Sequence, residues 1–272
     1  MKASLIIAFY NNTRYLALIF EALKRQTERD FEVIIADDGS NPDSVKIVDR
    51  LISEAPFPVN HVWHEDKGWR KNIILNKSVV AAKSDYIIFL DGDCIPHHKF
   101  IAEHTSMSTH GTVVAGRRVQ LTHVLSEAVT PRIISSGRLH SYVMPRMLWA
   151  GIKGEERHVD EGLRMTNKTM RRLFMNKRRR GILGCNFSMY KEDLMKVNGF
   201  DERFLLPGTG EDTDLEERLN RVGIFCRVES HHITVYHRKH KREDLINENV
   251  ALYEENNRNN VSWTPYGIVK EY

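Results

Sequence analysis

Cysteine is scarce in this chain of 272 residues, which contains three: Cys94, Cys185 and Cys226. They lie far apart, no two have the spacing of a zinc site, and their odd number does not indicate a disulfide framework. So few cysteines are typical of a protein from a reducing compartment, and we expect a cytoplasmic location.

Long apolar stretches are also missing. No segment approaches the roughly 20 apolar residues that a membrane-spanning helix needs. The N-terminal apolar run is too short for a signal peptide and is followed at once by the polar residues 11–14, so we expect it to form the first strand. With 41% hydrophobic and 28% charged residues and no internal repeat, the composition is that of a globular protein.

The positive charge of the chain is concentrated in one segment. The formal net charge is +4, yet residues 132–180 contain 13 Lys and Arg against 4 Asp and Glu. This basic segment shows no clean periodicity, and its section Lys168–Arg180 fits either an amphipathic helix on a membrane surface or a solvated helix or loop. We expect it to contact an anionic membrane or a phosphorylated acceptor, and we do not expect nucleic acid as a partner.

The first hundred residues alternate between predicted strands and helices. Apolar runs predict strands at 4–8, 31–36, 59–63 and 86–90, and helical spacing predicts helices between them, the third over 69–82. This order is typical of a mostly parallel, doubly wound α/β sheet. Further along, the sequence predicts strands at 112–115, 224–228 and 233–236, a helix containing Leu215, Leu219 and Val222, and a polar, partly helical tail.

Two carboxylates follow the fourth predicted strand, in the sequence Asp91-Gly92-Asp93. Ligands of open α/β sheets bind at the carboxyl ends of the strands. Acids this close repel each other unless a cation or a donor-rich ligand lies between them, and hard oxygen ligands suit Mg²⁺ and Mn²⁺. The pattern indicates a divalent metal with a phosphorylated ligand, although Asp-Gly is also a common turn dipeptide.

Four features occur in a fixed order along the chain: Phe9-Tyr10-Asn11-Asn12, Asp37-Asp38-Gly39-Ser40, Asp91-Gly92-Asp93, and Gly210-Glu211-Asp212 followed by His237. In this order they resemble the family 2 glycosyltransferases of the GT-A fold. The part from Gly184 to His237 is similar to the C-terminal region shared by galactosyltransferases and bacterial chondroitin-type polymerases. The resemblance covers residues 3 to about 240, apart from the basic segment.

This resemblance implies an α/β, Rossmann-like GT-A fold, in which a mostly parallel central sheet is flanked by helices and joined to a smaller C-terminal acceptor-side region. It implies one catalytic domain at 1–240, with a nucleotide-binding half at 1–95 and an acceptor half at 96–240, and a tail at 241–272. The implied function is inverting, metal-dependent sugar transfer from a UDP-sugar to a saccharide or lipid-linked saccharide, for cell-surface polysaccharide synthesis at the inner face of the membrane.

The resemblance also assigns residues to the donor site. Tyr10 is expected to stack on the uracil. Asp38 is expected to accept a hydrogen bond from the base, although it would equally fit an Asx turn. Asp91 is expected to contact the ribose, or the metal through water.

One part of the expected donor site departs from the family pattern. The usual Ala-Arg-Asn triplet at the start of the third helix is replaced by Trp69-Arg70-Lys71-Asn72. Arg70 is still expected to face the nucleotide or its phosphates, as an alternative to a solvated arginine.

The implied metal ligands are Asp93 and His237. Imidazole favours Mn²⁺ over Mg²⁺, so we expect a divalent ion with Mn²⁺ preferred. His231, His232 and His240 lie close enough in the sequence to compete with His237 for this role.

The implied catalytic residues are Asp212 and Glu211. Inverting transfer needs a carboxylate that removes the proton of the acceptor hydroxyl as its oxygen attacks the anomeric carbon. The resemblance makes Asp212 this base and gives Glu211 the acceptor hydroxyls. Acids in the first turn of a helix also stabilise the helix dipole whatever the function, which is the alternative for both.

Two other functions compete with this prediction. A sugar-phosphate nucleotidyltransferase would share the fold, but its glycine-rich signature is absent after the first strand, where Tyr10-Asn11-Asn12-Thr13-Arg14 stands. A non-enzymatic nucleic-acid or membrane-binding module built on residues 132–180 would need neither Glu211 nor Asp212.

Overall fold

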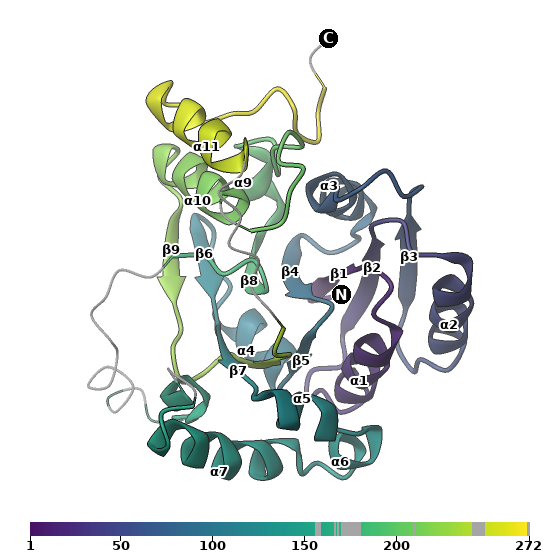
Figure 1. The fold of residues 1–272 in the computed structure, drawn as a ribbon. Coiled ribbons are helices and arrows are strands. Elements are labelled where there is room, and N and C mark those ends of the chain that lie inside the picture. Colours follow the sequence, from purple (N-terminus) through teal and green to yellow (C-terminus); the bar gives the residue numbers. More distant parts are fainter. Residues whose placement is uncertain are drawn as a thin grey trace.

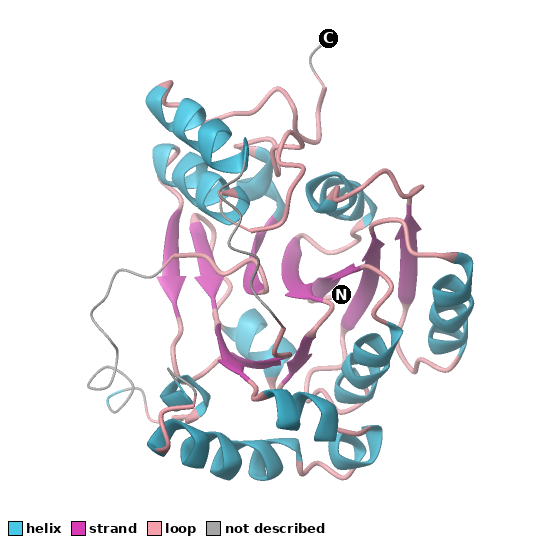
Figure 2. Cartoon of the chain, in the orientation of Figure 1, coloured by secondary structure: helices cyan, strands magenta, loops and turns pink. Residues whose placement is uncertain are grey.

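The computed structural model describes residues 1–155, 159–165, 167, 169, 181–208, 210–240 and 248–270. Its centre is a seven-stranded sheet with the order β3-β2-β1-β4-β8-β6-β9, flanked by helices (Figures 1 and 2). The strands are β1 (Ala3–Phe9), β2 (Phe31–Asp37), β3 (Val59–Trp63), β4 (Tyr86–Asp91), β6 (Thr112–Ala115), β8 (Asn186–Tyr190) and β9 (Phe225–Val228). A three-stranded sheet with the order β5-β10-β7 lies beside it, formed by β5 (Cys94–Pro96), β10 (Thr234–His237) and β7 (Arg117–Gln120).

The central sheet is mostly parallel. Strands β3, β2, β1 and β4 pair in parallel, and so do β6 and β9. Strand β8 is antiparallel to both of its neighbours, β4 and β6. The predicted α/β architecture and the GT-A arrangement are therefore confirmed.

Helices cover both faces of the parallel half because successive side chains of a strand point to opposite faces. Leu5 and Ile7 of β1 pack in one core with α1 (Thr13–Leu23) and α2 (Pro42–Ser53). Ile6 packs in a second core with α3 (Lys71–Ala81). Asn12 and Asn41 cap α1 and α2 by accepting from backbone amides, so both helices begin shortly after a strand ends.

Besides the short helix at Phe100–Ser106, three helices were not predicted from the sequence: α5 (His123–Ala128), α6 (Pro131–Ser135) and α7 (Leu139–Ile152). Pro131 starts α6 and Pro145 lies inside α7, and exposed apolar residues on α7 obscure the helical spacing of its buried ones. The predicted helix at 168–180 lies outside the described residues, apart from Thr169. The other helices are α4 (Phe100–Ser106), the 3₁₀ turn η1 (Val159–Gly162), α9 (Lys191–Met195), α10 (Glu211–Arg221) and α11 (Glu248–Arg258).

The segment between β6 and β8 is an excursion from the central sheet. It contains β7, α5–α7 and η1, and its two ends meet where Gly116 N donates to Asn186 O at 3.0 Å. A Cβ at position 116 would lie 2.3 Å from the Asn186 side chain, so only glycine allows this approach. In Figure 1 the helices of the excursion gather along one side of the molecule.

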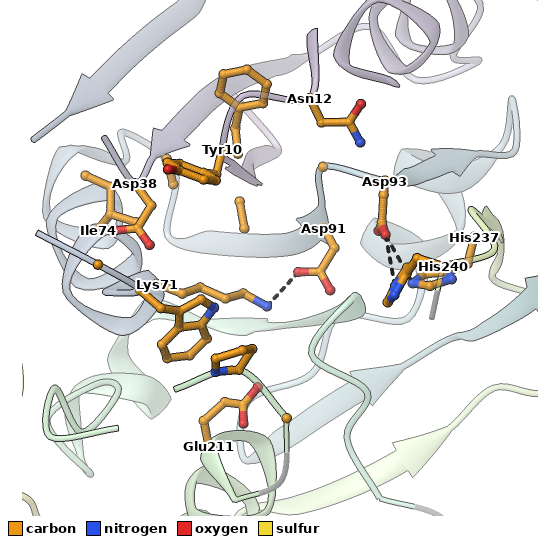
Figure 3. A pocket seen from close by; sticks show the side chains of 18 of the residues that line it. Tyr10, Asn12, Asp38, Lys71, Ile74, Asp91, Asp93, Glu211, His237 and His240 are labelled. Carbon is orange, nitrogen blue, oxygen red and sulfur yellow. Dashed lines mark hydrogen bonds and ion pairs between the residues drawn. The ribbon is translucent and has the colours of Figure 1, made fainter. Parts of the chain in front are cut away.

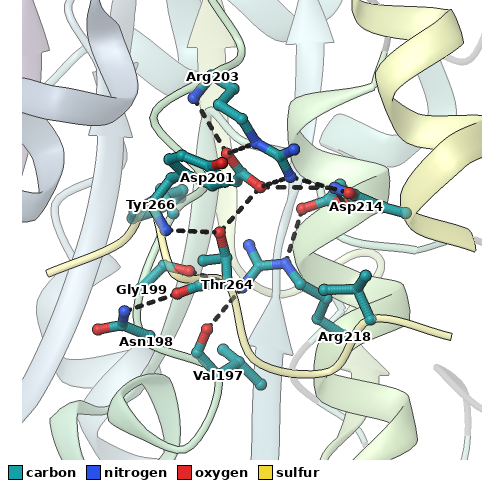
Figure 4. A network of polar contacts seen from close by, with 12 residues as sticks. Val197, Asn198, Gly199, Asp201, Arg203, Asp214, Arg218, Thr264 and Tyr266 are labelled. Atoms are coloured by element: carbon teal, nitrogen blue, oxygen red, sulfur yellow. Dashed lines mark hydrogen bonds and ion pairs between the residues drawn. The ribbon is translucent and has the colours of Figure 1, made fainter. Parts of the chain in front are cut away.

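A buried polar network fixes α10 (Figure 4). Arg218 is fully buried; its Nε donates to Asp214 Oδ2 at 2.7 Å and its Nη1 to the carbonyls of Val197 and Gly199. Asn256 of α11 donates to the other oxygen of Asp214 at 2.8 Å. The network therefore joins α10 to the turn before it and to the C-terminal segment.

The turn Asn198-Gly199-Phe200-Asp201 has an architectural role. Asn198 donates to the carbonyls of Thr264 and Val269, and Asp201 accepts from Thr264 Oγ1 at 2.9 Å. Phe200 is buried and packs edge-to-face on Phe89 of β4, with ring centroids 5.4 Å apart.

In the described part of the chain, none of the helices is both long and apolar enough to span a membrane.

Candidate active site

The carboxyl ends of β1, β2 and β4 meet at one edge of the sheet. Phe9 is in register with Asp37, and Ala8 with both Ala36 and Asp91, so the residues that follow these strands converge. They line a cavity of about 510 Å³ (Figure 3), whose wall includes Tyr10, Asp38, Asp66, Trp69, Lys71, Asp91, Asp93, Arg118, Glu211, His237 and His240.

Gly92 allows the two aspartates of Asp91-Gly92-Asp93 to approach β1. A Cβ at position 92 would lie 2.5 Å from the carbonyl oxygen of Ala8, closer than side chains pack. The sequence is also a turn, because β4 ends at Asp91 and β5 begins at Cys94. The turn and the paired carboxylates of the cavity are therefore the same feature.

One end of the cavity is formed by Tyr10 and Asp38. The Tyr10 ring is 52% exposed, and its hydroxyl donates to Asp66 Oδ2 at 3.0 Å. Asp38 is buried and is held by His64 Nε2 at 2.7 Å and by the Arg70 amide at 2.8 Å. The Asx turn belongs to its neighbour, because Ser40 N donates to Asp37 Oδ1. Asp38 is thus positioned for a ligand rather than for the turn.

The cation that enters the cavity beside this end is Lys71. The Arg70 guanidinium donates to the carbonyl of Glu65, and this side chain is not part of the cavity wall, unlike the position expected for it. Lys71 Nζ instead forms an ion pair with Asp91 Oδ1 at 2.7 Å. The residue that interrupts the family triplet therefore supplies the positive charge.

Lys71 also sets the electrostatics of the cavity. Burial alone would lower the pKa of its ammonium, but Asp91, Asp212 and Glu211 outweigh burial and raise this pKa. For the Asp91 carboxyl, burial alone would raise the pKa, but the neighbouring Lys71 charge outweighs burial and lowers this pKa below its ordinary value. Both groups are therefore charged at neutral pH.

The opposite end of the cavity gathers possible metal ligands. His237 Nε2 lies 3.4 Å and His240 Nε2 3.5 Å from Asp93 Oδ2, and both histidines face this carboxylate in Figure 3. Burial and the Arg118 charge lower the pKa of His237 to about 3, so its imidazole is neutral and able to ligate. Burial and Asp91 raise the pKa of Asp93 to about 6, which a cation would reverse. This donor set fits a divalent ion.

The other two histidines that compete by sequence lie elsewhere. The carbonyl of His231 accepts from Met165 N, and His232 Nδ1 lies 4.0 Å from Glu103 Oε1. Of the four candidates, the structure brings His237 and His240 to Asp93.

Glu211 and Asp212 are the first two residues of α10, which approaches the cavity between its two ends. Glu211 lines the cavity, and its Oε2 is buried without a hydrogen-bond partner. Burial and Asp212 raise the pKa of Glu211 to about 7. Asp212, the next residue, is not part of the cavity wall; its Oδ2 accepts from Gly184 N at 2.8 Å, and burial raises the pKa of this carboxyl as well. Asp214, in the same turn, is directed away from the cavity and pairs with Arg218.

Two family profiles match this chain in sequence. Residues 4–121 match glycosyl transferase family 2, and residues 164–241 match a profile described as the N-terminal domain of galactosyltransferase. The chain belongs to glycosyltransferase family 2. This glycosyltransferase is 26% identical to chondroitin synthase of Escherichia coli over 238 residues, which cover 82% of its own length and 33% of that protein. It spans between 23% and 33% of the length of the curated relatives that it matches first.

Solved structures share the fold of this glycosyltransferase. A mannosyltransferase of Pyrobaculum calidifontis in complex with GDP-Man and Mn²⁺ is 16% identical, with a TM-score of 0.56 over 89% of this chain and 58% of that one. Glucosyl-3-phosphoglycerate synthase of Mycobacterium tuberculosis, in complex with Mn²⁺, UDP and glucosyl-3-phosphoglycerate, is 16% identical, with a TM-score of 0.52 over 96% and 80%.

Sequence reasoning missed three residues that shape the cavity of this glycosyltransferase. His64 and Asp66 follow β3, and the rule that ligands bind at the carboxyl ends of parallel strands could have found them. Arg118 lies on β7, which had not been predicted. No sequence signal pointed to Arg118, because β7 exists by pairing with β10, more than a hundred residues away.

Proposed function

We propose that this chain is the catalytic module of an inverting, metal-dependent hexosyltransferase that takes its sugar from a UDP-sugar. One observation carries the proposal: a single cavity joins Asp38 at one end, Asp93 with His237 at the other, and Glu211 at the side. A nucleotide sugar needs a partner for its base, neutralisation of its diphosphate and a carboxylate near the acceptor, and the cavity offers groups for all three.

The uracil is assigned to the end formed by Tyr10 and Asp38. The ring of Tyr10 is exposed and free to stack on a base, and Asp38 is a carboxylate that accepts from the uracil N–H. His64 and the Arg70 amide hold the Asp38 carboxylate in place, and each of its oxygens can still accept a further hydrogen bond. The related fold that binds UDP supports this assignment, whereas the one with GDP-Man shows that the fold alone does not select the base.

The metal is assigned to Asp93 and His237, with Mn²⁺ preferred over Mg²⁺ because a neutral imidazole is in the ligand set. A divalent ion bound there would neutralise the diphosphate and the charge that develops on the leaving group. Asp91 and its partner Lys71 lie between this end and the base end, where the ribose and the sugar would pass.

The acceptor side is assigned to the first turn of α10. Asp212 takes the proton of the acceptor hydroxyl as its oxygen attacks the anomeric carbon, and Glu211 hydrogen-bonds the acceptor. The pKa of Glu211 is raised to about 7, and burial raises the pKa of Asp212 above its ordinary value, which makes each carboxylate a stronger base. Similarity to chondroitin synthase supports a saccharide acceptor, free or lipid-linked, in the synthesis of a cell-surface polysaccharide.

We further propose that α7 touches the inner face of an anionic membrane. Arg146, Trp149, Ile152 and Lys153 recur at helical spacing on one side of α7, and Trp149 and Ile152 are 59% and 77% exposed. An exposed tryptophan with an aliphatic neighbour and two flanking cations is the pattern of a helix that lies in a lipid headgroup layer. We call this surface the α7 face; it lies within the described part of the basic segment 132–180.

The donor assignment is tested by calorimetric titration of UDP and GDP, with and without Mn²⁺, into the wild type and Asp93→Ala. We expect UDP to bind more tightly than GDP, and Mn²⁺ to strengthen UDP binding in the wild type but not in Asp93→Ala. Asp43→Ala, which removes a side chain that is 90% exposed on α2, is the matched control and should bind as the wild type does. The metal assignment would be refuted if Mn²⁺ did not change the affinity for UDP, or if Asp93→Ala bound UDP with Mn²⁺ as tightly as the wild type does.

A further inference from the structure

A buried thiol that the proposed transfer reaction does not use, Cys94, lies beside the metal end of the cavity. One ligand atom each from Asp93, Cys94 and His237 lie within 4.8 Å of one another. His240 Nε2 adds a fourth donor, 3.5 Å from the Asp93 carboxylate. We propose that these four residues form a zinc site, in which Cys94 gives the cavity a second mode of metal binding that blocks sugar transfer.

The spacing of the donor atoms suits a tetrahedral ion. Ligand atoms placed 2.0–2.3 Å from Zn²⁺ at tetrahedral angles lie roughly 3.3–3.5 Å apart. The two imidazole nitrogens lie 3.4 and 3.5 Å from Asp93 Oδ2, and Cys94 Sγ lies 3.6 Å from Asp93 Oδ1. The donors next to the Asp93 carboxylate are therefore near tetrahedral spacing, and the ligand atoms of Asp93, Cys94 and His237 are at most 4.8 Å apart.

The backbone holds most of this site in place before any ion arrives. Cys94 and His237 are register partners in the antiparallel pair β5–β10, and Arg238 N donates to Asp93 O at 3.0 Å. Cys94 and His237 are buried, while the His240 side chain is half exposed and can close the site from the solvent side. Three ligands are thus preorganised, and the fourth reaches the site from the solvent side.

The donor atoms determine which ion the site prefers and whether that ion supports or blocks sugar transfer. A thiolate and two imidazoles favour Zn²⁺ over Mn²⁺ or Mg²⁺, and the Cys94 thiol releases one proton when its sulfur binds the ion. Four protein ligands fill the coordination sphere of Zn²⁺, so no position stays open for a diphosphate oxygen. Zn²⁺ is therefore an inhibitor that competes with the productive ion at Asp93.

Co²⁺ is a spectroscopic probe for this site, because a sulfur ligand gives it an intense near-ultraviolet charge-transfer band and tetrahedral geometry gives it strong visible bands. We expect both in the wild type, together with their loss on addition of Zn²⁺. Cys94→Ser should lose the charge-transfer band, whereas Cys226→Ser, which removes the thiol of β9, should keep it. A spectrum without the sulfur band, or one that Cys94→Ser leaves intact, would overturn the proposal.

A second variant, at a half-exposed residue, tests the site independently in case Cys94→Ser does not fold. His240→Ala alters a half-exposed side chain and should weaken Zn²⁺ binding at least about tenfold and reduce the visible bands. Unchanged Zn²⁺ affinity in His240→Ala would contradict the four-ligand site. None of these measurements uses a nucleotide, so the zinc site can fail while the UDP assignment holds, and the reverse.

Discussion

At the scale of single residues, Glu211 shows how the cavity stores unfavourable charge. Its carboxyl is buried beside Asp212, one of its oxygens has no hydrogen-bond partner, and its pKa is raised from 4.5 to about 7. The buried carboxyls of Glu211 and Asp212 therefore destabilise the folded chain.

Glu211→Gln is expected to stabilise the protein in a pH-dependent way. In the unfolded chain Glu211 releases its proton near pH 4.5, and in the folded chain near pH 7, so the folded state holds the extra proton between these values. The wild type therefore loses stability as the pH rises from 4.5 to 7, and the variant lacks this loss. We expect a gain on the order of 1 kcal/mol or more at pH 8, and little at pH 4.

Thermal unfolding of Glu211→Gln from pH 4 to pH 8, without metal or nucleotide, measures this gain. Glu254→Gln, which alters an exposed glutamate of α11, should follow the wild type at every pH. A stability difference that does not change with pH would show that Glu211 has an ordinary pKa in the folded protein.

At this scale the sequence predicted which residues lie in the cavity where a polar residue stands at the end of a predicted strand. Asp38, Asp91 and Asp93 follow buried parallel strands, and all three lie in the cavity. The sequence did not predict that Lys71 rather than Arg70 would line the cavity. Neighbouring side chains at a helix start point in different directions, and the sequence does not fix which of them enters the cavity. The assigned roles of all these residues stay predictions.

At the scale of elements, α10 carries the candidate catalytic turn at one end and a buried ion pair in its middle. Arg218 reaches from the helix to the carbonyls of Val197 and Gly199, and Asp214 is bound by both Arg218 and Asn256. The position of Glu211 and Asp212 thus depends on contacts made up to about two helical turns further along α10.

Arg218→Ala is expected to destabilise the protein by about 3–5 kcal/mol, because it leaves the buried Asp214 carboxylate without its cation. Urea denaturation measures the loss. Arg50→Ala, on the exposed side of α2, is the matched control and should change stability by about 0.5 kcal/mol or less. A loss of similar size in both variants would mean that the network in Figure 4 does not support α10.

Elements with strong periodicity were predictable, and those that depend on distant pairing were not. The strands β3 and β6 have the predicted bounds, since β3 begins directly after Pro58 and β6 is a mostly apolar run between Gly111 and Gly116. Strand β7 contains two arginines and one valine, and only pairing with β10 makes it a strand. In α7 the buried Val143, Met147 and Ala150 keep helical spacing, but Pro145 interrupts the pattern.

At the scale of the whole molecule, the α7 face predicts binding to lipid. Vesicles that contain phosphatidylserine should bind the protein more tightly than vesicles of phosphatidylcholine, and added salt should weaken the binding. The double variant Trp149→Ser/Ile152→Ser should lower the partition coefficient about tenfold, because two apolar side chains no longer enter the headgroup layer.

Co-sedimentation with vesicles measures this partition. Phe225→Ser, which removes an aromatic side chain that is 62% exposed on β9, is the control for a general loss of apolar surface. Equal binding to anionic and neutral vesicles, or an equal effect of the two sets of substitutions, would remove the membrane from the proposed function.

The excursion between β6 and β8 makes recombination between relatives feasible. Its ends meet across one hydrogen bond, Gly116 N to Asn186 O, so residues 117–185 can be exchanged as a cassette without lengthening or breaking the central sheet. The cassette carries Arg118 and the α7 face, while Asp38 and Asp93 stay in the frame. Chimaeras built at these two junctions would therefore separate what the frame contributes to donor choice from what the cassette contributes to location and acceptor.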